Sequence, residues 1–164
     1  MEIIKDYRDN KELRDSFNKL AEKVFGLNFE NWYQNGFWKK NYNPFSIVID
    51  GKVVANISVN QCNMNYNGSV LRLIQLGTVM TDPDYRGKGY SRIIMEEVLK
   101  EYEGKVDGIY LYANDSVLDF YPKFGFAQRQ EYQHIKQISN ATTNVTEKVS
   151  MDTPEDFEKM SDEN

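Results

Sequence analysis

The chain has 164 residues, of which 40% are hydrophobic, and this is enough for one domain with a buried core. No stretch approaches the roughly 18 apolar residues of a membrane span. Its net charge of -5 comes from residues 152–164, so the neutral remainder gives no electrostatic case for binding nucleic acid. The single cysteine, Cys62, and the single histidine exclude an internal disulfide and leave little for a zinc site, so we expect a cytoplasmic protein without a metal.

The N-terminal part of the chain predicts a strand, two helices and a hairpin. The first helix has the clearest pattern, because its apolar residues recur at helical spacing and Gly26 follows as a plausible C-cap. An Asp50-Gly51 turn joins the two strands of the hairpin. In chain order we expect a strand at Glu2–Tyr7, helices over residues 11–25 and Phe29–Lys39, and strands at Phe45–Asp50 and Lys52–Asn63.

A strand–helix–strand unit is expected in the middle of the chain. The long strand from about Ser69 to Met80 is stopped by Pro83, which cannot donate to a ladder. The elements that follow are a helix at Gly89–Tyr102, a strand at Gly108–Ala113, a helix at Asp115–Phe124, and strands at Phe126–Ile138 and Val145–Met151. This order implies an α+β (mixed α/β) domain in which the unit over residues 70–113 contains a parallel pair.

The loop YRGKGYS, residues 85–91, lies between the long strand and the helix after it. Helices usually begin with acidic residues, because the macrodipole is positive there, but this one begins among Arg86, Lys88 and Arg92. A bound anion could replace the missing carboxylates, and Gly87 and Gly89 would let the backbone approach it closely. An ordinary glycine turn with solvated cations is the alternative. The Walker A and dinucleotide-binding patterns both fail on spacing.

Two motifs resemble the GNAT superfamily of acyl-CoA-dependent N-acetyltransferases. The first is that family's diphosphate loop, [Q/R]-x-x-G-x-[G/A], matched from Arg86 through Gly89 to Ser91, with serine as a departure at the last place. The second lies in NDSVLDFYPKFGF, where Asn114, Tyr121 and the Gly125-Phe126 pair stand in register with the family's pattern. The resemblance covers roughly residues 1–150. It implies a mostly antiparallel mixed sheet with one splayed parallel pair, flanked by about four helices.

The resemblance also implies a chemistry and a set of residues that serve it. The reaction would transfer an acetyl group from acetyl-CoA to a primary amine by direct attack in a ternary complex. Tyr121 would be the general acid that protonates the leaving thiolate, unless it is a packed helix tyrosine. Asn114 would bond the pantetheine arm or cap the next helix. The cofactor would be held by the loop Arg86, Gly87, Lys88, Gly89, Tyr90 and Ser91 and by the backbone of Val79, Met80 and Thr81.

The sequence says less about the residues that bind the amine acceptor than about those that bind the cofactor. The strand before the loop carries no carboxylate and its central polar residue is Gln75, so we name no general base. An aromatic cluster stands where the family builds its acceptor wall, and Trp32, Trp38 and Gln75 are expected to contact a small or medium-sized amine. His134 is expected to be an exposed strand residue, and Cys62 a half-buried one.

We expect the catalytic domain to span residues 1–151. The acidic segment 152–164 would be a frayed tail or the start of a further helix, because Thr153, Pro154 and Glu155 form a strong helix start. Assembly as a homodimer is left open. The competing function is a non-catalytic acyl-CoA-binding sensor or scaffold, although a pure scaffold would need neither the intact loop nor Tyr121.

Overall fold

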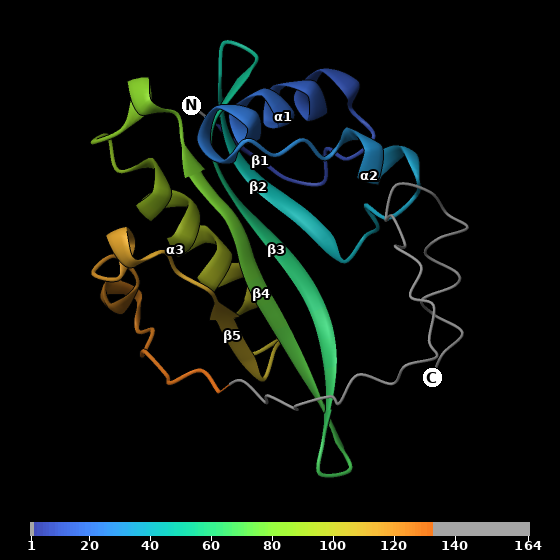
Figure 1. Cartoon of the computed structure of the whole chain (residues 1–164), viewed down its shortest axis with the longest axis vertical. Coiled ribbons are helices and arrows are strands. Elements are labelled where there is room, and N and C mark those ends of the chain that lie inside the picture. Colours follow the sequence, from blue (N-terminus) through green and yellow to red (C-terminus); the bar gives the residue numbers. More distant parts are fainter. Residues whose placement is uncertain (1, 133–164) are drawn as a thin grey trace, which may run out of the picture. The chain divides into compact units, whose positions relative to one another are not determined.

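A mixed five-stranded sheet is the frame of the computed structural model, which describes residues 2–132 (Figure 1). Residues up to Ala127 form one compact unit, and the fold below is that of this unit. In spatial order the strands are β1 (Glu2–Ile4), β2 (Tyr42–Ile49), β3 (Lys52–Tyr66), β4 (Ser69–Thr81) and β5 (Gly108–Leu111). All neighbours are antiparallel except β4 and β5, which are parallel. The prediction of a mixed, mostly antiparallel sheet is confirmed.

The parallel pair opens at one end, as expected. Pairing between β4 and β5 runs from Leu73 opposite Gly108 to Leu76 opposite Leu111 and then stops. Strand β4 continues to Thr81 beside β3. Residues 77–81 therefore have an edge that no strand of the described part of the chain covers.

Helix α1 (Lys11–Phe25) begins and ends where its caps predict. The Asn10 side chain accepts a hydrogen bond from the Leu13 amide at 3.1 Å. At the other end Gly26 adopts a left-handed conformation, φ 69° and ψ 21°, and its N–H donates to the Glu22 carbonyl at 3.0 Å, while the N–H of Leu27 donates to the Ala21 carbonyl at 3.4 Å. A non-glycine residue would be strained there, so the C-cap prediction for Gly26 is confirmed.

Two clusters of buried residues lie on the sheet. Helix α3 (Tyr90–Tyr102) packs its buried side chains, including Ile94, Met95 and Val98, with residues of β2, β3 and β4 such as Ile57 and Ile74. Helix α1 and the segment after it form the second cluster, whose members are Tyr7, Phe17, Leu20, Ala21, Trp38, Val53 and Met80. Strand β3 contributes Ile57 and Val59 to the first cluster and Val53 to the second.

The number of helices was overestimated. The described residues contain three α-helices, α1, α3 and the short α2 (Glu30–Gln34), instead of about four. The expected helix at Asp115–Phe124 is replaced by two 3-10 turns, Asp115–Val117 and Tyr121–Phe124. Pro122 explains the break, because it has no N–H and its ring disfavours a helical residue before it.

The C-terminal strands are not found in the part of the chain that the structure describes. From Phe126 to Tyr132 the backbone is not in a strand, and every residue except Phe126 is exposed. This stretch is mostly polar, so it lacks the alternating apolar side chains that hold a strand on a core. The rest of that strand, the strand at Val145–Met151, His134, the domain end at 151 and the segment 152–164 lie outside the described residues.

Within residues 2–132, no helix has the length and apolar character needed to cross a membrane.

Candidate active site

The start of α3 lacks the usual helix cap. Gly89 is the N-cap residue, with φ 77° and ψ 11°, and it has no side chain to accept from the first amides. Gly87 is also left-handed, with φ 75°. The first turn has no acidic residue. The free N–H groups at this end of α3 therefore point to an anion as their partner.

The space in front of these glycines is open. A Cβ atom built on Gly87 or Gly89 would meet no heavy atom within 4 Å. A diphosphate can therefore approach the backbone at both positions, so the residues present fit the cofactor that the sequence motif implies. Ser91 departs from the motif but has a structural role, because its hydroxyl and that of Thr81 are hydrogen-bonded at 2.8 Å. This bond ties the end of β4 to the first turn of α3.

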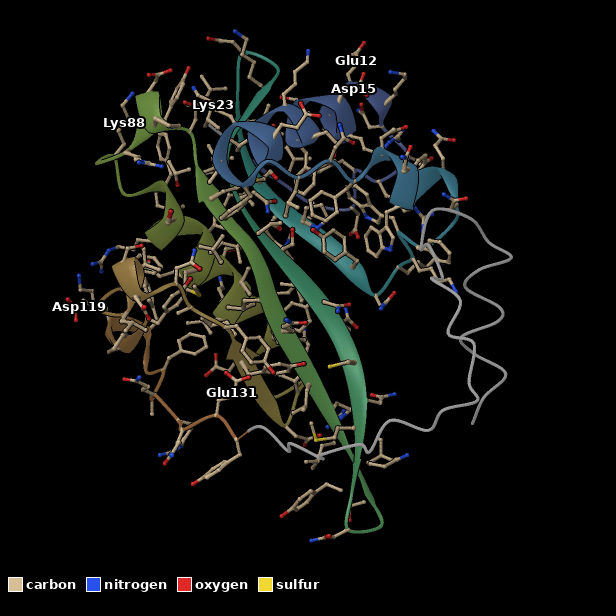
Figure 2. All side chains as sticks on the ribbon, in the orientation of Figure 1. Glu12, Asp15, Lys23, Lys88, Asp119 and Glu131 are labelled. Carbon is tan, nitrogen blue, oxygen red and sulfur yellow. The ribbon has the colours of Figure 1, made fainter. Side chains whose placement is uncertain are left out.

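The charges around the loop favour an anion as well. Arg86 and Lys88 are exposed and form no ion pair within residues 2–132, although Lys88 lies 4.6 Å from the centre of the Tyr85 ring. The nearby carboxylates of Asp82 and Asp84 are bound by Lys23 of α1, at 2.7 and 3.2 Å. Figure 2 shows Lys23 and Lys88 at the same end of the molecule. Lys23 thus offsets the only acidic residues in the approach to the loop.

The strand that leads to the loop contains a β-bulge. Ser58 of β3 is paired with Gly77 and Asn56 with Met80, so Thr78 and Val79 together stand opposite one residue. Thr78 has a positive φ of 41°, which is unfavourable for a β-branched residue. The bulge lies directly after the last pair of β4 and β5. It therefore bends β4 where the two parallel strands part.

The 3-10 turn that contains Tyr121 approaches the first turn of α3. The Tyr121 ring is 8% exposed and packs 5.3 Å from Phe120 and 6.0 Å from Phe126. Phe124, in the same 3-10 turn, lies 5.8 Å from the Arg92 guanidinium in the first turn of α3. Burial raises the pKa of Tyr121, which keeps the phenol protonated at neutral pH.

The hydroxyl of Tyr121 has no hydrogen-bond partner among the described residues. No buried polar side-chain atom in that part of the chain lacks a partner, so this hydroxyl must reach accessible space. A phenol with a buried ring, a proton and an accessible oxygen has the properties of a general acid. Asn114 is exposed and its side chain does not cap the turn that follows, so the capping alternative is not observed.

A row of polar side chains crosses the sheet beside the bulge. Tyr42 of β2 is paired with Asn60 of β3, Asn60 with Gln75 of β4, and Gln75 with Tyr110 of β5. Paired residues present their side chains on one face, here the face that bears α1. All four residues are half-buried and uncharged. We call Tyr42, Asn60, Gln75 and Tyr110 the polar row.

Trp38 is enclosed by neighbouring aromatic rings. It is 2% exposed, packs edge-on against Phe17 and Tyr42 at 5.4 and 5.3 Å, and donates its indole N–H to the Tyr42 carbonyl at 3.2 Å. A side chain so enclosed is part of the core, which does not favour its expected contact with the acceptor. Trp32 is half-buried in the same cluster, 5.0 Å from Tyr42, and keeps an accessible side.

The sequence motifs did not identify Asn60, Tyr110 or the bulge at Thr78. Asn60 and Tyr110 join Gln75 only through strand register, which the motifs do not encode. The one signal for the bulge was Gly77 inside a strand pattern, a position where glycine often marks such an irregularity. Cys62 is a half-buried residue of β3, as expected, and its sulfur lies 3.8 Å from the Tyr110 hydroxyl.

Solved acetyltransferases have this fold. A predicted acetyltransferase from Clostridium acetobutylicum, solved with acetyl-CoA, superposes with a TM-score of 0.65 at 16% identity, over 82% of this chain and 95% of that one. A ribosomal-protein-alanine N-acetyltransferase from Brucella melitensis gives 0.65 at 15% identity, over 84% and 100%. An aminoglycoside acetyltransferase from an uncultured soil sample gives 0.62 at 17% identity, over 85% and 96%. The fold is that of this class of acyltransferases.

The family model for the acetyltransferase (GNAT) domain matches residues 7–129, about three quarters of the chain. The chain therefore belongs to the GNAT acetyltransferase family. It is an acyltransferase that takes its acetyl group from acetyl-CoA.

Proposed function

We propose that this chain transfers the acetyl group of acetyl-CoA to a primary amine of a small or medium-sized acceptor, by direct attack. The amine nitrogen attacks the thioester carbonyl, so that a C–N bond forms and the C–S bond breaks. Tyr121 gives its proton to the departing thiolate, and the amine loses a proton to solvent. The open, uncapped start of α3 carries this proposal, together with a protonated Tyr121 in the 3-10 turn that approaches it.

Different residues bind the diphosphate and the pantetheine arm of acetyl-CoA in this proposal. Loop residues 86–91 hold the diphosphate through free amides and two cations. The uncovered edge of β4, over Val79, Met80 and Thr81, offers backbone groups to the pantetheine arm, as a neighbouring strand would. The side chain of Asn114 is exposed and free to bond the same arm. Positioning supplies most of the effect, because a phenol and a thiol differ little in pKa.

The acceptor meets the polar row and Trp32. The row offers amide and hydroxyl groups and no carboxylate, so it favours an amine with neutral hydrogen-bonding substituents over a polycation. Gln75 is at the middle of the row, next to the point where β4 and β5 part. Trp32 offers an aromatic face to the apolar or cationic part of the acceptor.

Binding of CoA to a Gly89→Asp variant tests the cofactor site. A carboxylate at residue 89 would enter the open space and repel the phosphates, so we expect calorimetry to show at least a hundredfold loss of affinity, about 3 kcal/mol. Gly104→Asp is the matched control, because Gly104 is also left-handed, with φ 67°, and has free space around it. It follows the other end of α3, about 20 Å away at 1.5 Å per residue. If both variants bound CoA like the wild type, the loop would not be the cofactor site.

Release of free thiol from acetyl-CoA, measured across a panel of amines, tests the reaction. We expect turnover with at least one neutral-substituted primary amine and none with Gly89→Asp. Binding of acetyl-CoA without turnover of any amine would instead support the sensor or scaffold function.

A further inference from the structure

A buried cluster of polar side chains holds the β4 bulge from the α1 face of the sheet. The amide nitrogen of Asn56 donates to the Thr78 carbonyl at 2.9 Å and to the Ser58 hydroxyl at 3.0 Å, and it lies 3.3 Å from the Thr78 hydroxyl. The Thr78 hydroxyl in turn donates to Ser58 at 2.5 Å. We call Asn56, Ser58 and Thr78 the bulge clamp.

Further hydrogen bonds continue the buried cluster behind the clamp. The Asn56 carbonyl oxygen accepts from the Ser46 hydroxyl at 2.9 Å, and Ser46 is bonded to the Tyr7 hydroxyl at 2.7 Å. Asn56 and Ser58 are each only 1% exposed. Because the Thr78 carbonyl can only accept, the Asn56 amide must present its nitrogen to it, and this fixes the orientation of the side chain.

The cluster is not a route for protons from the acceptor site to solvent. Such a route needs groups that each accept one proton and release another. The Asn56 amide interrupts the hydroxyl chain between Ser58 and Ser46, and burial keeps Tyr7 protonated by raising its pKa far above the ordinary value. The role of the cluster is therefore structural. It provides a hydrogen-bond donor for the Thr78 carbonyl, which the bulge removes from the regular ladder.

We propose that Asn56 is a positioning residue for acyl transfer, because it holds Thr78 in its left-handed conformation and so keeps the edge of residues 77–81 open to the pantetheine arm. Thr78 would leave a positive φ without the bonds from Asn56, and β4 would straighten toward β5. The clamp also sets the polar row, because the Tyr42 hydroxyl bonds to that of Thr78 at 3.2 Å. This inference rests on the proposed function, in which that edge receives the cofactor.

The test compares Asn56→Ala with Ser46→Ala. Both variants remove buried hydrogen bonds of one cluster, but only Asn56 contacts β4, so Ser46→Ala controls for lost stability. We expect Asn56→Ala to raise the KM for acetyl-CoA about tenfold, as the loss of one or two hydrogen bonds to a positioned backbone implies. Ser46→Ala should lower the Tm and leave that KM within about twofold of wild type.

A second substitution makes the test independent of folding. Glycine adopts a positive φ without strain, so Thr78→Gly in the Asn56→Ala background should recover part of the lost affinity for acetyl-CoA. Thr78→Val, which keeps the shape of the side chain, should raise the KM in the same direction if Asn56→Ala does not fold. An unchanged KM for acetyl-CoA in Asn56→Ala would overturn the role of Asn56 and leave the proposed function standing. If Asn56→Ala does not fold, an unchanged KM in Thr78→Val would have the same meaning. Failure of the wild type to bind acetyl-CoA would overturn the proposed function and this inference together.

Discussion

Tyr121 combines a buried ring with an accessible hydroxyl. The ring is anchored by Phe120 and Phe126, and Pro122 follows Tyr121 in the same 3-10 turn, so the phenol has little freedom to move. Burial raises its pKa above the ordinary value of 10, so the proton is present throughout the neutral and mildly alkaline range. Tyr121 thus has both the proton and the fixed position that the proposed general acid needs.

Tyr121→Phe should leave the affinity for CoA nearly unchanged and lower kcat by about 10²-fold, the lower part of the range for general acid–base catalysis. The ring stays in place, so packing is kept while the proton is lost. Calorimetry with CoA and steady-state kinetics with the best amine measure the two effects. Tyr102→Phe is the control, because Tyr102 is a buried tyrosine of α3 at the end of the helix away from the loop. An unchanged kcat in Tyr121→Phe would make Tyr121 a packing residue.

The segment from α2 to β2 is held by aromatic packing. Trp38 is the centre of this packing, with the rings of Phe17, Trp32, Tyr33 and Tyr42 within 6.3 Å of its own. These contacts fix the segment on α1, and through Tyr42 they reach the polar row. We therefore expect Trp38 to support the proposed acceptor site through packing.

Trp38→Ala should destabilise the fold by about 3–5 kcal/mol, the usual cost of truncating a buried tryptophan. Thermal or urea unfolding measures this directly. Trp32→Ala is the matched control, because Trp32 belongs to the same cluster but is only half-buried and should cost less than half as much. Trp32→Ala should instead raise the KM for the amine. If Trp38→Ala raised that KM and left the stability intact, the sequence-based prediction for Trp38 would be right after all.

Ion pairs between segments far apart in the chain contribute to the stability of the whole molecule. Glu30 accepts from the buried Arg14 at 2.8 and 3.3 Å, Glu101 from Lys5 at 2.9 Å, and Asp82 from Lys23 at 2.7 Å. These hydrogen bonds hold the pKa of each carboxyl below its ordinary value. The unfolded chain therefore binds protons more readily, and stability falls as the pH drops below the ordinary values of 4.5 and 3.8.

Glu30→Gln should lower the free energy of unfolding at pH 7 by about 2 kcal/mol, a typical figure for hydrogen bonds to a charged group. Arg14 is 4% exposed, so its charge would lose its main partner in the core. The difference from wild type should shrink as the pH falls below about 4.5, where Glu30 of the unfolded chain takes up its proton. Denaturant unfolding between pH 3 and pH 7 measures it. Glu12→Gln is the control, since Glu12 is exposed on α1 (Figure 2) and forms no ion pair within the described residues. A pH-independent difference would contradict the ion pair.

The sequence by itself determined the family, the mixed sheet and the parallel pair, and it singled out the glycine loop as the proposed anion site. These depend on local signals: helical spacing from Leu13 to Val24, a glycine where φ must be positive, and a fixed distance between the loop and Tyr121. Such signals depend on residue types and their spacing along the chain, so they can be read without the fold.

Only the tertiary structure decided what the rest of the site is made of. The polar row exists because strand register brings Asn60, Gln75 and Tyr110 together, and a shift of one residue would send each side chain to the other face. Asn56 clamps Thr78 only because a bulge places one residue of β3 opposite two of β4. Trp38 and Trp32 are tryptophans of the same aromatic segment, and only their burial shows that Trp38 belongs to the core while Trp32 keeps an accessible side. Pairing and burial are properties of contacts between distant segments, and no local pattern of residues records them.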